Sequence, residues 1–132
     1  MKTTKALFAG AAVAACALVW AASTYGAPPA PGGMAIDADD IAGVVRGANG
    51  PEAGVWVIAE TSDLPTKLAK IVVTDHQGRY LLPDLPRASY DVWVRGYGLV
   101  DSPKQRAEPG TMLDLKATPA PNARAAAEYY PA

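Results

Sequence analysis

Hydrophobic and polar residues alternate, or form short apolar runs, along the middle of the chain. This is the pattern of β-strands, in which successive side chains point to opposite faces. The expected strands are residues 41–46, 55–60, 70–74, 79–82, 90–95 and 111–117. Segments rich in Gly, Pro, Asn and Asp separate them. Short strands at this spacing predict an all-β fold, a small antiparallel β-sandwich.

The turn between the third and fourth expected strands has the sequence DHQG. Asp75 is a residue type that accepts hydrogen bonds from its own turn, and Gly78 supplies the positive φ that a short hairpin loop needs. We therefore expect residues 70–74 and 79–82 to form a β-hairpin, with Asp75 and Gly78 as its structural turn residues.

The start of the chain has the pattern of a secretory signal peptide. Lys2 and Lys5 precede an apolar run at residues 6–22, and small residues follow it. The run is slightly shorter than the ~20 residues of a membrane-spanning helix, which is the alternative. Cys16, the only cysteine, lies in a context similar to the lipobox of bacterial lipoproteins. The pattern predicts a periplasmic or secreted protein, with membrane attachment only if Cys16 is lipidated.

The rest of the chain divides by composition. We expect a signal peptide at residues 1–27, a linker rich in Pro, Gly and Asp at residues 28–40 and the β-sandwich at residues 41–117. A tail follows at residues 118–132, with a short Ala-rich helix at residues 122–130.

Two Val-Trp-Val triplets point to a binding face. If Val55, Val57, Val92 and Val94 face the core, the residues between them face outward. The predicted interaction face contains Trp56, Ile58, Leu81, Trp93 and Arg95. A solvated sheet face alternates to polar residues instead. Three explanations remain open: cover by the chain's own loops or Ala-rich helix, docking of a protein partner or missing downstream domain, and stacking on polysaccharide that also uses Tyr97.

Composition and charge exclude several other functions. The formal net charge is −1 and basic residues are scattered, which argues against nucleic acid as a partner. A single histidine, His76, and a single cysteine cannot build an ordinary zinc site or a Cys–His pair. No nucleophile elbow or nucleotide-binding glycine loop is present. We therefore expect no catalytic residue, no metal and no cofactor.

Acidic residues are the remaining candidates for a catalytic or metal-binding site. Glu60 and Asp63 lie at the exit of a strand, where solvated charges are normal. Asp37, Asp39 and Asp40 lack the spacing of a known calcium loop, so a solvated linker is the preferred interpretation.

The order of these motifs resembles the carboxypeptidase regulatory-like domain. The resemblance covers residues 41–117 and rests on Ile41-x-Gly43-x-Val45, Gly54-Val55-x-Val57, Thr74-Asp75-x-x-Gly78-x-Tyr80, Leu85-Pro86, Tyr90-x-Val92-x-Val94 and Gly96-Tyr97. Ala88 and Ser89 stand where the family usually has Gly. The resemblance implies a transthyretin-like or Cna-B-like sandwich, classed with carbohydrate-binding-like folds. It also implies an exported, non-catalytic module for protein docking or scaffolding, related to the N-terminal module of larger secreted bacterial proteins, with carbohydrate binding as the alternative.

Overall fold

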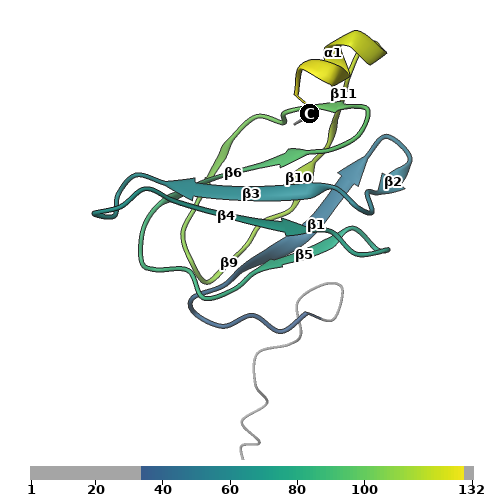
Figure 1. Cartoon of the computed structure of the whole chain (residues 1–132). Helices are drawn as coiled ribbons and strands as arrows, with labels where there is room; N and C mark the ends of the chain where they lie inside the picture. The colour runs from purple at the N-terminus through teal and green to yellow at the C-terminus, as the bar shows by residue number, and fades with distance from the viewer. Residues whose placement is uncertain (1–33, 130–132) are drawn as a thin grey trace, which may run out of the picture.

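The computed structural model of the chain describes residues 34–129 and is mostly β (Figure 1). Several antiparallel strand pairs form its sheets, as predicted. Within this range no helix is both long enough and apolar enough to cross a membrane. The predicted signal peptide and Cys16 lie outside the described residues.

One sheet is built around β1 (Ile41–Gly47). The antiparallel neighbours of β1 are β2 (Gly50–Pro51) and β5 (Arg79–Leu82), and its parallel neighbours are β9 (Thr111–Met112) and β10 (Leu115–Lys116). The first strand of the domain, β1, is therefore paired with β9 and β10, which lie near its C-terminal end in sequence.

The second sheet has the order β4-β3-β6-β8 and is antiparallel throughout. Its strands are β3 (Trp56–Thr61), β4 (Leu68–Val73), β6 (Tyr90–Arg95) and β8 (Gln105–Ala107). A small third pair joins β7 (Leu99–Val100) to β11 (Thr118–Pro119).

The core lies between the two larger sheets and is apolar. Its largest fully buried side chains are Tyr80, Tyr90, Ile41, Leu82, Val45, Val57, Val92 and Val94. The valines that the sequence placed inward are therefore in the core. Because side chains alternate along a strand, this fixes the residues between them on the outer faces.

The last predicted strand, residues 111–117, is divided in two and runs parallel to β1, where an antiparallel partner was expected. The division occurs at Leu113 and Asp114. Asp114 Oδ1 accepts a hydrogen bond from the Val44 N–H at 3.0 Å, in place of a backbone carbonyl. The Leu113 carbonyl instead accepts from the Tyr80 hydroxyl. Burial raises the pKa of Tyr80, so the hydroxyl keeps the proton it donates.

In the DHQG turn, Asp75 and Gly78 have the predicted roles, but the two strands that the turn joins do not pair with each other. Asp75 Oδ1 accepts from the N–H groups of Gln77 and Arg79, both at 2.9 Å, and Gly78 has φ +73°. The Arg79 backbone hydrogen bond lowers the pKa of Asp75. The hairpin prediction was wrong, because β4 pairs with β3 and β5 pairs with β1. The turn carries the chain from one sheet to the other.

We expect Gly78→Val to lower the free energy of unfolding by about 2–3 kcal/mol, because the left-handed conformation is strained for a β-branched residue. A Cβ at this position would also lie 2.6 Å from the Val45 carbonyl oxygen. Gln77→Ala, at an exposed neighbouring position, should change stability by less than about 0.5 kcal/mol. Urea unfolding of both variants checks this, and equal midpoints would contradict it.

The predicted Ala-rich helix is present as α1 (Ala123–Glu128). The Asn122 side chain caps it by accepting from the Ala125 N–H at 2.9 Å. The helix packs beside β7, at one end of the domain (Figure 1). It therefore does not cover the outer face of the β4-β3-β6-β8 sheet, which was one of the explanations for outward tryptophans.

Candidate functional site

The outer side of the β4-β3-β6-β8 sheet brings both tryptophans of the Val-Trp-Val triplets together. Cross-strand partners share a face in an antiparallel sheet, so the pairing register defines its rows. The three rows are Val73–Trp56–Arg95, Ile71–Ile58–Trp93 and Ala69–Glu60–Asp91–Arg106. We call this surface the tryptophan face.

The half of the tryptophan face over β4 and β3 is apolar and open. Ile71 and Val73 are each 57% exposed, and Trp56 between them and β6 is half-buried. Isolated apolar residues are normal on a protein surface, whereas a contiguous group of this kind marks an interaction site. Sequence reasoning missed Ile71 and Val73, because the run Ile-Val-Val does not reveal which of its members face outward.

The half over β6 and β8 is occupied by ion pairs. Lys104 Nζ lies 3.1 Å from Glu60 Oε1 and 4.3 Å from the centroid of the Trp93 ring. Two arginine–carboxylate pairs lie beside it: Arg95 with Asp101, at 2.7 Å through both of its hydrogen bonds, and Arg106 with Asp91 at 3.1 Å. This half therefore forms a polar border to the apolar half.

Trp93 is covered by its surroundings rather than open to solvent. Its side chain is only 6% exposed, and so is that of Ile58. The Lys104 ammonium lies over the ring, which is the geometry of a cation–π contact. For Trp93, the structure agrees with the first of the three explanations, cover by the chain's own residues, because the Lys104 ammonium lies over its ring.

Trp93 also has an unsatisfied polar atom. Its Nε1–H is buried and has no hydrogen-bond acceptor among the described residues. A buried donor without a partner costs about 1–3 kcal/mol, so the surrounding contacts must outweigh this cost.

The predicted interaction face is present only in part. Trp56, Ile58, Trp93 and Arg95 lie on one surface. Leu81 is 37% exposed but belongs to β5, where it pairs with Ala42 in the other sheet. The error follows from the expected hairpin, since a β5 paired with β4 would have placed Leu81 in the same sheet as the two tryptophans.

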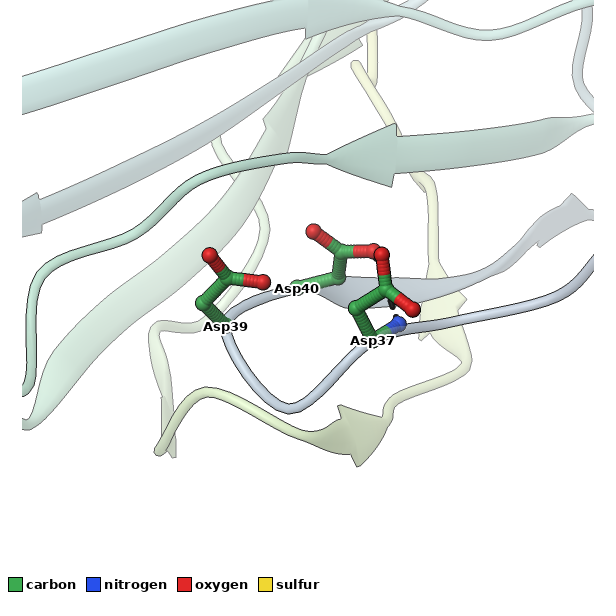
Figure 2. Close-up of side chains that lie close together, drawn as sticks. All are labelled: Asp37, Asp39 and Asp40. Carbon is green, nitrogen blue, oxygen red and sulfur yellow. Dashed lines mark hydrogen bonds between the residues drawn. The ribbon is translucent and has the colours of Figure 1, made fainter.

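Three carboxylates meet before β1. Carboxylate oxygens of Asp37, Asp39 and Asp40 all lie within 4.8 Å of one another (Figure 2). They would offer three of the about six to eight oxygen ligands that calcium takes. Asp40 is only 6% exposed, although the sequence placed it in a solvated linker. Its carboxylate accepts from the N–H groups of Asp37, at 2.9 Å, and Asp84, at 3.3 Å. These bonds attach the segment before β1 to the turn after β5.

A hollow of about 420 Å³ lies on the other sheet and was not predicted. Its lining residues are Val44, Arg46, Pro51, Gln77, Arg79, Met112 and Asp114. The two arginines are already engaged, Arg46 with Asp114 at 3.4 Å and Arg79 with Asp75 at 2.7 Å. The hollow is open to solvent and is lined by both apolar and polar residues, and each of its arginines is neutralised by a neighbouring aspartate.

The residues weighed as catalytic candidates have structural partners. Glu60 is paired with Lys104, and Asp63 Oδ2 accepts from the Ser89 N–H at 3.2 Å. One serine hydroxyl, that of Ser102, is buried and also accepts a hydrogen bond, from the Val94 N–H at 2.8 Å. His76 lies in the DHQG turn and is exposed.

A scan against protein-family models finds no match to this chain, and a search of curated proteins finds no significant relative.

Proposed function

We propose that this protein is an exported, non-catalytic β-sandwich module that docks another protein through the tryptophan face. The observation that carries the proposal is the exposure of Ile71 and Val73, 57% each, beside the half-buried Trp56. The core does not require these side chains on its outer side. Protein interfaces commonly combine such an apolar centre with a polar border, which the ion pairs of β6 and β8 would supply.

The chemistry of the face favours a protein partner over polysaccharide. Sugar rings stack on flat, open aromatic faces, but Lys104 occupies the Trp93 ring. The open side chains are the aliphatic Ile71 and Val73, which suit the irregular apolar side chains of a protein. Tyr97 is 81% exposed, and it lies in the turn after β6 rather than in the sheet.

The sequence supports the remaining parts of the proposal. The order of charged, apolar and small residues at positions 1–27 supports export to the periplasm or beyond. The resemblance to the carboxypeptidase regulatory-like domain, with its transthyretin-like fold, supports a role as a docking or scaffolding module. In that role the partner is a separate protein or a downstream domain.

The proposal is tested by removing Trp56 from the face. Trp56→Ala should lower stability by only about 1–2 kcal/mol, because the ring is half-buried, and should leave the domain folded. The immobilised variant should then lose a protein that the wild type captures from the exported protein fraction of the producing cell. Thermal unfolding confirms the fold, and mass spectrometry identifies the captured species.

Leu81→Ala is the matched control, because Leu81 is exposed on the other sheet. This variant should capture the same protein as the wild type. Identical capture by Trp56→Ala and the wild type would contradict the proposal. Retention of the wild type on insoluble polysaccharide, lost in Trp56→Ala, would replace protein docking with carbohydrate binding.

A further inference from the structure

β4 is an edge strand with an apolar outer side. β3 pairs with one of its edges, and no other strand in residues 34–129 pairs with the opposite edge. Exposure alternates along its six residues, with Ala69, Ile71 and Val73 as the exposed members. An unpaired apolar edge is a template for a further strand, and proteins usually protect such edges with charges, proline or a covering segment.

The backbone N–H and carbonyl groups of Ala69, Ile71 and Val73 point away from β3, toward the unpaired edge of β4. The Thr74 N–H donates to the Val55 carbonyl at 2.9 Å, so Thr74 faces β3. Bonded positions alternate in an antiparallel ladder, which places Leu68, Lys70 and Val72 in the bonds to β3. Ala69, Ile71 and Val73 therefore present their N–H and carbonyl groups to an incoming strand.

The edge is complementary to itself in one register. Antiparallel pairing of two copies around Ile71 places Ala69 opposite Val73 and Lys67 opposite Asp75. The Asp75 carboxylate is already paired with Arg79 at 2.7 Å but is partly exposed, so Lys67 adds a second, weaker charge attraction at each end. Centring the pair on Lys70 would place two ammonium groups opposite each other, and centring it on Val72 would separate Lys67 from Asp75.

Lys70, the charged residue of the strand, does not block this register. Its ammonium donates to the Pro83 carbonyl at the end of β5, so it is held toward the other sheet. In the Ile71-centred register Lys70 lies opposite Val72 of the other copy, where its aliphatic stem can pack.

We propose that a second copy of this chain pairs with β4 around a twofold axis at Ile71, so that two four-stranded sheets become continuous. The interface adds about six backbone hydrogen bonds, because each bonded pair exchanges two. An interface this small gives weak association, and we expect half-dimerisation at on the order of 100 μM. This proposal extends the proposed function by identifying one partner. It rests on that function only in taking the exposed residues Ile71 and Val73 to be a docking surface.

Sedimentation equilibrium of the full-length chain, from about 10 μM to 1 mM, tests the pairing. We expect concentration-dependent dimer for the wild type and monomer throughout for Ile71→Lys, which places two ammonium groups opposite each other. Lys67→Glu, which would face Asp75, should weaken dimerisation at least about tenfold. Leu81→Lys is the matched control, since Leu81 is exposed on the edge strand of the other sheet, and it should dimerise as the wild type does.

Hydrogen exchange locates the contact in the same samples. The amides of Ala69, Ile71 and Val73 should become protected at high concentration, while those of residues 79–82 should not change. A monomeric wild type at every concentration, undiminished dimer in Ile71→Lys or Lys67→Glu, or protection confined to another segment would overturn the proposal. The Trp56 capture experiment does not depend on these results, so the docking function and the self-pairing can fail separately.

Discussion

Gly43→Ala is expected to lower the free energy of unfolding by at least ~3 kcal/mol, a large part of the stability of a small domain. A Cβ at position 43 would overlap the Leu113 carbonyl oxygen and lie 2.6 Å from its carbon. That carbonyl is backbone and accepts the buried Tyr80 hydroxyl, so it cannot move without leaving a donor unpaired. Urea unfolding, followed by tryptophan fluorescence, measures the loss.

Gly98→Ala is the control for Gly43→Ala, because it measures the stability lost when a glycine is replaced at a position where the new Cβ meets no other atom. Gly98 has φ +70°, and a Cβ there would meet nothing within 4 Å. Only the conformational strain remains, which costs about 1–2 kcal/mol. If Gly43→Ala were no less stable than Gly98→Ala, the close approach of β1 and the segment between β9 and β10 would be refuted.

Trp93→Ala is expected to cost about 3–5 kcal/mol, as for a large aromatic side chain in a core. The reason is its 6% exposure beneath Lys104, on a face where neighbouring Trp56 is only half-buried. Trp56→Ala should therefore be the milder substitution in the same sheet. Chemical denaturation of both variants gives the comparison, and a Trp93→Ala variant within ~1 kcal/mol of the wild type would contradict it.

Trp93→Phe isolates the buried N–H from the ring. The substitution keeps an aromatic surface beneath Lys104 and removes a donor that has no acceptor. We expect a change within about 1 kcal/mol of the wild type, because the smaller ring and the lost unpaired donor act in opposite directions. A loss as large as that of Trp93→Ala would show that the indole N–H makes a stabilising contact.

The strands with clear alternation were predictable, and those without it were not. Residues 79–82 and 90–95 are strands with the predicted bounds, because alternating Tyr, Leu and Val marked their inward sides. β8 lies in a stretch that reads as a loop, since Gln105 and Arg106 are polar and Pro103 precedes them. The division between β9 and β10 depends on Asp114 bonding to Val44, a contact that no local pattern signals.

The candidate site was half predictable for the same reason. Alternation placed Trp56 and Trp93 on an outer face correctly, because it depends only on neighbouring residues. The burial of Trp93 depends on Lys104, whose position follows from the pairing of β8 with β6. The separation of Leu81 from this face depends on the strand partner of β5. Such tertiary choices are not encoded in local periodicity.

The parallel pairing of β1 with β9 and β10 also governs when the chain can fold. The Val44 N–H bonds to Asp114, 70 residues further along the chain, and Val45 pairs with Leu115. Contacts between distant residues slow folding, because the intervening chain must be closed into a loop before they form. A chain synthesised from its N-terminus cannot complete the β1 sheet until Lys116 has emerged. Until then β1 lacks its two parallel neighbours, so the sheet that holds the first strand is among the last parts of the domain to be completed.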